Sequence, residues 1–129
     1  MYPKELNYTK THEWVKETEE FITVGITSFA VEELSDIVYV ELRPEGEKVK
    51  KGSSLGTLES VKAVSDIYSP VSGEIREFNS KLQNQPELLN KDPYGEGWVI
   101  RLTPVERQEL KGLMNAEEYE KFVEEEKGN

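Results

Sequence analysis

The chain has 129 residues, 36% of them hydrophobic and 33% charged, so it can bury one modest core beneath a heavily charged surface. Its 26 acidic and 16 basic residues give a formal net charge of −10, which disfavours nucleic acid and anionic membranes as partners. The absence of cysteine excludes disulfides, thiolate metal sites and a cysteine nucleophile.

Short apolar runs separated by turn residues begin near the N-terminus, a pattern typical of a small antiparallel β fold. His12–Glu17 and Phe21–Ile26 predict two strands joined by a short polar turn. The next segment, Ser28–Leu34, has apolar residues at helical spacing behind a serine suited to capping, so we expect a short helix there. Ile37–Leu42 (IVYVEL) then predicts a further strand.

The centre of the chain predicts a tight hairpin. Leu55–Ser60 and Val64–Tyr68 have the pattern of half-buried strands, and the three residues between them leave room only for a turn. Lys62 is therefore expected at or beside the tip. Taken alone, a lysine in such a place is usually a solubilising surface charge.

The C-terminal third changes character along its length. Asn79–Gly97 is rich in Asn, Pro and Gly and predicts a long loop, followed by a final strand at Trp98–Leu102. Thr103–Glu106 presents a cap, a first-turn proline and a capping-box glutamate, so a helix is expected through Leu110. A second helix is expected after Asn115, with Glu118 completing its capping box and with Tyr119, Phe122 and Val123 on one apolar face.

Residues 59–75 around Lys62 read ESVKAVSDIYSPVSGEI. This segment resembles the lipoylation segment of glycine cleavage H proteins. Biotin carriers instead resemble AMKM at the tip, and lipoyl domains of 2-oxoacid dehydrogenases usually show DKA there. The likeness spans nearly the whole chain in one order. It continues through HEWV at 12–15, VGIT at 24–27, DIVYVEL at 36–42, PELLN at 86–90, DPYGEGW at 92–98 and AEEYEKF at 116–122.

This resemblance implies a mainly β fold, the flattened lipoyl/biotinyl-type barrel or barrel-sandwich hybrid. One lipoyl-carrier domain would cover 1–129, with a β core and N-terminal extension at 1–102 and a helical segment at 103–129. It implies lipoate attached covalently to Lys62 as N6-lipoyllysine, and a carrier with no catalytic site. The arm would take the aminomethyl group of glycine from a pyridoxal-phosphate glycine decarboxylase to a tetrahydrofolate-dependent aminomethyltransferase, and dihydrolipoyl dehydrogenase would reoxidise it. A lipoate ligase or lipoyl transferase would load it.

The resemblance also implies a cleft that shields the loaded arm from water. It points to Glu13 and Asp66 as acids for a cationic amine, and to Thr11 as a nearby hydroxyl. Alternatively, each of the two is an ordinary surface charge, one of 26 acidic residues in the chain. His12, the single histidine, is expected to pack or hydrogen-bond rather than bind a metal.

Three alternatives stay open at this stage. An H-like protein that passes lipoate to other enzymes would share Lys62. An enzyme using Glu13 and Asp66 as general acid and base is disfavoured because the chain lacks an ordered nucleophile and base. The third is an unmodified scaffold. We expect the protein to be a monomer. We also expect it to be cytoplasmic, because no apolar run approaches the roughly 20 residues of a membrane span and the chain opens with no targeting pattern.

Overall fold

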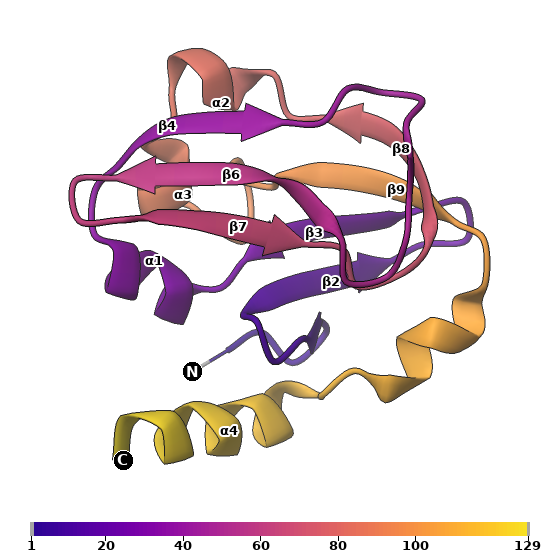
Figure 1. Ribbon diagram of the computed structural model, residues 1–129. Helices are drawn as coiled ribbons and strands as arrows, with labels where there is room; N and C mark the ends of the chain where they lie inside the picture. Colours follow the sequence, from indigo (N-terminus) through magenta and orange to yellow (C-terminus); the bar gives the residue numbers. More distant parts are fainter. Residues whose placement is uncertain (1, 129) are drawn as a thin grey trace.

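The computed structural model describes residues 2–128, which form two antiparallel sheets (Figure 1). The larger sheet has the order β1 (Asn7–Tyr8), β2 (Glu13–Glu17), β3 (Ile22–Ile26), β9 (Ile100–Pro104), β8 (Gly73–Phe78) and β5 (Lys48–Val49). The smaller one has the order β4 (Ile37–Leu42), β6 (Ser54–Ser60) and β7 (Val64–Tyr68). The expected mainly β architecture is confirmed.

One hydrophobic core lies between the sheets and explains their alternating sequences. Val24 and Leu102 reach it from the larger sheet, and Leu58 and Ile67 from the smaller one, all with at most 1% exposure. Burying a side chain of this kind contributes about 1.5–3 kcal/mol. Strand β3 is buried at all five positions because it lies between β2 and β9 and faces packed side chains on both surfaces.

The helix after the first hairpin is present as α1 (Ser28–Leu34), but its cap is Thr27, not Ser28. Thr27 has extended backbone angles, and its hydroxyl accepts a hydrogen bond from the Ala30 N–H at 3.2 Å. Ser28 is already helical, and its hydroxyl lies 3.0 Å from that of Tyr94. The extended conformation directs the Thr27 side chain over the first free N–H groups of the helix, as capping requires.

The prediction of a long loop at Asn79–Gly97 is wrong. This segment contains two single-turn helices, α2 (Lys81–Asn84) and α3 (Leu88–Lys91), and each buries one leucine completely, Leu82 and Leu89. A four-residue helix is too short to display helical periodicity, so only its burial against the sheets reveals it.

The last strand and the following helix are both displaced from their predicted positions. Strand β9 is Ile100–Pro104, because Thr103 and Pro104 continue the ladder opposite Glu74 and Gly73 of β8. The expected cap at Thr103 is therefore wrong. The helix that follows is the 3-10 helix η1 (Arg107–Gly112), and Glu106 caps it by accepting from the Gln108 N–H.

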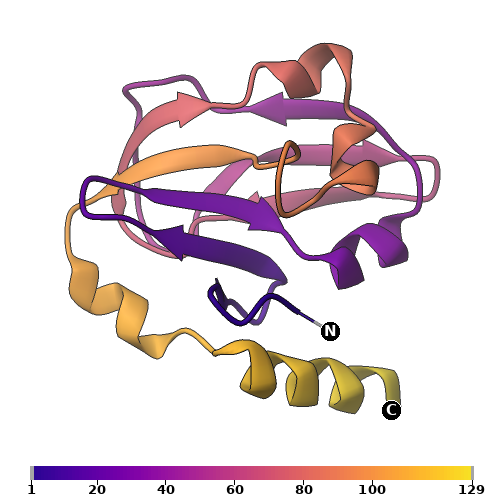
Figure 2. The same ribbon diagram turned by 180° about the vertical axis from the view of Figure 1, so that it is seen from behind.

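The final helix, α4 (Ala116–Gly128), starts with the predicted capping box. Asn115 accepts from the Glu118 N–H at 2.8 Å, and the Glu118 carboxylate accepts from the Asn115 N–H at 2.9 Å. Tyr119 stacks on Tyr8 with ring centroids 4.7 Å apart, so α4 lies along the N-terminal strands, as Figures 1 and 2 both show. No helix of the described residues is long and apolar enough to span a bilayer.

Candidate functional site

Lys62 lies at the tip of the hairpin between β6 and β7, as predicted. Glu59 and Val64 form the last strand pair, and Val61, Lys62 and Ala63 make the turn, all three exposed. Figure 1 shows this tip projecting from one end of the smaller sheet, beside α1. The Lys62 amine is therefore open to approach by another protein.

Ser60 holds the turn from within. Its side chain is only 8% exposed, and its oxygen accepts from the N–H groups of Lys62 at 3.1 Å and of Ala63 at 3.0 Å. The same hydroxyl donates to the Ala63 carbonyl at 3.2 Å, and the Ser60 N–H donates to that carbonyl at 2.8 Å. These bonds fix the backbone from which the Lys62 side chain projects.

A second segment supports the tip from behind. The Val61 N–H donates to the Asp36 carbonyl at 3.1 Å, which ties the turn to the connection between α1 and β4. Asn90 of α3 clamps that connection, since its amide donates to the Ser35 carbonyl at 2.8 Å and accepts from the Ile37 N–H at 3.0 Å. Asn90, the last residue of the PELLN motif, thus contributes to the shape of the hairpin tip although it lies 28 residues after Lys62 in the sequence.

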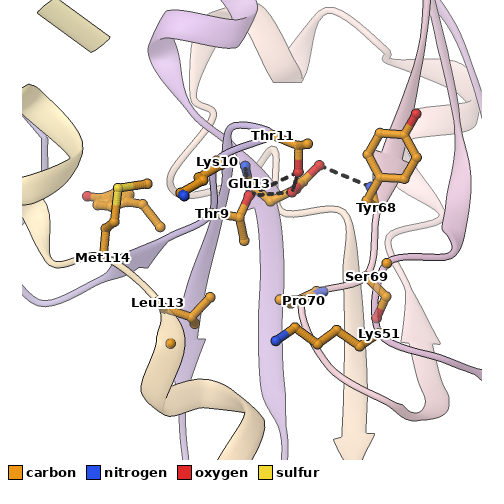
Figure 3. Close-up of a pocket in the computed structure, with 13 residues that line it drawn as sticks. Thr9, Lys10, Thr11, Glu13, Lys51, Tyr68, Ser69, Pro70, Leu113 and Met114 are labelled. Carbon is orange, nitrogen blue, oxygen red and sulfur yellow. Dashed lines mark hydrogen bonds between the residues drawn. The ribbon is translucent and has the colours of Figure 1, made fainter. Parts of the chain in front are cut away.

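Glu13 opens β2 and is almost fully buried, with 1% exposure. Its Oε1 accepts from the hydroxyls of Thr9 and, at 2.6 Å, of Thr11, while Oε2 accepts from the Tyr68 N–H at 3.0 Å (Figure 3). Desolvation raises the pKa of this carboxyl above its usual value, and the three hydrogen bonds oppose that rise without cancelling it. Because a carboxylate offers about four acceptor positions, one remains on Oε2.

Glu13 and Thr11 line a cavity of about 490 Å³ between the β1–β2 turn, the end of β7 and the segment before α4. Two cations, Lys10 and Lys51, line it as well, so its charge is mixed. Figure 3 shows Leu113 and Met114 on the side opposite Tyr68. The remaining lining residues are Tyr8, Thr9, Gly52, Ser69, Pro70 and Gly112.

Thr11 also lines a second cavity, of about 350 Å³, that lies nearer the hairpin tip. Ser65, three residues after Lys62, forms one wall, and Ala30 and Leu34 of α1 form an apolar wall. The acids Glu33 and Glu126 lie at this cavity too, together with Phe29, His12 and Lys127. The two cavities share Thr11 as a lining residue; Ser65 lines the smaller one and the buried Glu13 lines the larger one.

The structure brings Glu13 and Thr11 together, but not Asp66. Asp66 is exposed, its carboxylate accepts from the Ser54 hydroxyl at 3.3 Å, and it lines neither cavity. It lies opposite Thr57 on β6, which in turn lies opposite Glu41 on β4, and this row faces away from the core. Asp66 shares neither of these cavities nor a hydrogen bond with Glu13, so its expected role beside Glu13 stays a prediction.

His12 packs and hydrogen-bonds, as predicted. Its Nδ1 lies 2.7 Å from the Tyr119 hydroxyl, its Nε2 lies 2.9 Å from a Glu126 carboxylate oxygen, and its ring is 4.8 Å from that of Phe29. The backbone at His12 has φ of +73°, so the chain turns sharply just before Glu13. No group of three His, Asp or Glu residues suited to a metal occurs among residues 2–128.

Sequence reasoning missed Thr9 and Tyr68 as partners of Glu13. Thr9 is four residues before Glu13 and could have been found from the TKTHE pattern, because a turn brings such neighbours together. Tyr68 contributes only its backbone N–H, which carries no signal in the side-chain sequence. Its approach depends on folding β7 against the start of β2.

Comparisons with known proteins point in one direction. The glycine cleavage H-protein family model matches residues 6–126. The chain is 52% identical over 124 residues to the glycine cleavage system H protein of Rubrobacter xylanophilus, covering 96% of each chain. It is 49% identical over 123 residues to that of Anaeromyxobacter sp. (strain K), covering 95% and 96%. The crystal structure of a glycine cleavage system H protein from Mycobacterium marinum superposes with a TM-score of 0.84 at 38% identity, covering 98% and 99%.

Proposed function

We propose that this chain is the lipoyl carrier of a glycine cleavage system, because it belongs to the glycine cleavage H-protein family. The observation that supports this most directly is Lys62, exposed at a hairpin tip whose backbone N–H groups from residues 60 to 63 are all hydrogen-bonded. A carrier arm needs such an anchor, because the amine must be open to a partner while its base stays fixed.

Acylation needs only the amine from this chain. The neutral Nζ of Lys62 attacks the acyl carbon of lipoyl adenylate, an amide bond forms, and the acyl–phosphate bond breaks so that AMP leaves. The nitrogen then loses a proton to solvent. The partner enzyme, a lipoate ligase or lipoyl transferase, activates the acyl group, and this chain contributes the position of the nucleophile.

Lipoate, when bound, supplies a disulfide that accepts the aminomethyl group of glycine and later returns as a dithiol to be reoxidised. The chain's own residues then offer a route along which the arm can be sheltered. The smaller cavity includes Ser65, near the tip, and its wall of Ala30 and Leu34 offers apolar contact to an aliphatic chain. It ends at Thr11, whose hydroxyl donates to Glu13.

Glu13 is the residue we assign to the amine at the end of that route. Its Oε2 accepts one hydrogen bond and keeps a position for another N–H donor. An ammonium donor would also favour the anionic form of this buried carboxyl. We do not assign Asp66 to this contact, because its exposed carboxylate lines neither cavity.

The decisive experiment is intact-mass measurement after incubation with a lipoate ligase, ATP and lipoate. We expect one lipoyl-sized increment in the wild type and in Lys81→Arg, and none in Lys62→Arg.

The partners we propose are the glycine decarboxylase, the aminomethyltransferase and dihydrolipoyl dehydrogenase. The acylated protein should support exchange of labelled bicarbonate into the carboxyl group of glycine with an active decarboxylase. Absence of exchange would favour a lipoate relay to other enzymes.

A further inference from the structure

Exposed apolar side chains gather beside the Lys62 tip. Val38 and Tyr39 of β4 are 51% and 53% exposed, and Val61 and Val64 at the tip are 67% and 69% exposed. We call these four residues the tip patch. Figure 1 shows that the described helices leave the outer face of the smaller sheet open. Water therefore covers an apolar surface directly beside the nucleophilic amine.

The backbone of β4 is shaped to expose this surface. Ile37 lies opposite Ser60, but Tyr39 lies opposite Glu59, so one extra residue is inserted into β4 between these pairs. This irregularity turns both Val38 and Tyr39 outward, although ordinary alternation would direct one of them into the core. Leaving two neighbouring apolar side chains in water forgoes the stabilisation that their burial would give, which points to a partner that covers them.

Apart from Lys62 itself, the charged side chains on the face that carries the tip patch are acidic. Strands β4, β6 and β7 contain no Lys or Arg, and their outer face carries Glu41, Glu59 and Asp66. The ion pairs of the described residues include none of these three acids. The next cation along β4, Arg43, lies past the strand and pairs with Glu47 at 2.6 Å. The acids on this face therefore remain uncompensated.

We infer that the tip patch and its three acids form the docking surface for the enzyme that acylates Lys62. That enzyme would contact this surface with an apolar recess bordered by its own arginine or lysine side chains. This inference rests on the proposed function and adds the partner's contact surface to it. Uncompensated acids beside apolar side chains are complementary to a basic surface with an apolar centre.

The acylating enzyme is the occupant because of where its chemistry occurs. It must bring an activated acyl carbon to Nζ of Lys62 itself, so its surface must close around the tip. Enzymes that act on the loaded arm need to reach only the far end of the long lipoyl-lysine side chain, so they can bind the carrier elsewhere. Val61 and Val64 flank the turn, and Tyr39 lies in the same cross-strand row as Glu59 and Val64.

The apolar contact is tested with variants that keep β-branched shape. Val38→Thr combined with Val64→Thr should raise KM for acylation by a lipoate ligase roughly tenfold with kcat within twofold, from the loss of two apolar contacts. Val105→Thr is the matched control, because Val105 is 79% exposed and lies outside the patch. Thermal unfolding of each variant verifies that the fold is retained.

The charge contribution is tested by Glu41→Gln combined with Asp66→Asn. This pair should also raise KM and flatten its dependence on salt concentration, because fewer charges attract the basic partner. Glu117→Gln combined with Glu120→Gln changes the net charge equally on exposed positions of α4 and should leave KM and its salt dependence at wild-type values.

Two outcomes would overturn the inference. Wild-type KM in both surface variants means that the enzyme does not contact this face. Normal acylation together with impaired bicarbonate exchange by the acylated variants means that the face serves the arm-processing enzymes instead. Failure of the wild type to be acylated at all would remove the carrier function and this inference with it, and intact mass distinguishes that case at once.

Discussion

The hydroxyl oxygen of Ser60 accepts a hydrogen bond from the backbone N–H of Lys62 at 3.1 Å, so the proposed modification site is held by the side chain two residues before it. Ser60 is buried while Lys62 is exposed. The reactive amine thus lies on an exposed side chain that projects from a hydrogen-bonded backbone. This combination lets a partner enzyme orient the amine without first ordering the turn.

Removing that hydroxyl should loosen the turn. We expect Ser60→Ala to lower the free energy of unfolding by about 1 kcal/mol, because the part-buried N–H groups of Lys62 and Ala63 lose their acceptor. We also expect kcat/KM for acylation to fall roughly fivefold, equivalent to about 1 kcal/mol of lost positioning. Amide hydrogen exchange at Lys62 and Ala63 should accelerate. Ser60→Thr restores the hydroxyl and should recover most of the acylation rate, and a loss equal to that of Ser60→Ala would contradict the positioning role.

The buried Glu13 should give the stability a distinctive pH dependence. Burial raises its pKa in the folded protein, so the folded state holds this proton at pH values where the unfolded chain has released it. Its contribution is therefore fully present below the ordinary glutamate pKa of roughly 4.3 and is lost as pH rises through the raised folded pKa. Urea unfolding of wild type and Glu13→Gln across that range measures the difference.

The variant should unfold with a shallower loss of stability on going from acid to neutral pH. Exposed Glu87→Gln is a suitable control and should follow the wild-type curve. Parallel pH profiles for wild type and Glu13→Gln would show that the folded-state pKa of this carboxyl is not raised.

Asn90 should matter more than its position in a short helix implies. Asn90→Asp removes the amide donor and faces a carboxylate toward the Ser35 carbonyl, so we expect a loss of about 1–3 kcal/mol in unfolding free energy. Hydrogen exchange at Ile37 and Val61 should accelerate, since both N–H groups depend on the clamped connection. Asn84→Asp, at an exposed position of α2, should change neither measurement; unchanged exchange in Asn90→Asp would argue against the clamp.

The Tyr119 hydroxyl links α4 to the rest of the fold. It lies 2.7 Å from the hydroxyl of Thr27, which caps α1, and 2.7 Å from Nδ1 of His12. We expect Tyr119→Phe to lower the unfolding free energy by about 1–2 kcal/mol, because two partly buried polar groups lose a partner. Chemical denaturation provides the measurement. Tyr39→Phe, at an exposed hydroxyl, should be neutral, and an equally neutral Tyr119→Phe would show that the bonds contribute little.

Local features of the sequence were sufficient wherever a structural signal lies within a few residues. The apolar run Ile37–Leu42, the three-residue gap around Lys62 and the reciprocal pair Asn115 and Glu118 each predicted an element that the structure has, although not the irregularity within β4. They succeed because strand faces, tight turns and helix caps are determined by neighbouring residues. The same local rules failed at Thr103, where pairing with β8 outweighs a cap signal.

By itself, the sequence determined the mainly β class, the hairpin that presents Lys62 and the family to which the chain belongs. Tertiary structure alone decided that Glu13 is buried and accepts a hydrogen bond from the Tyr68 N–H, and that Asn90 supports the tip. The physical reason is distance along the chain: 55 residues separate Glu13 from Tyr68, and 53 separate Ile37 from Asn90. Such contacts form only when the sheets close over their common core, and no local pattern encodes them.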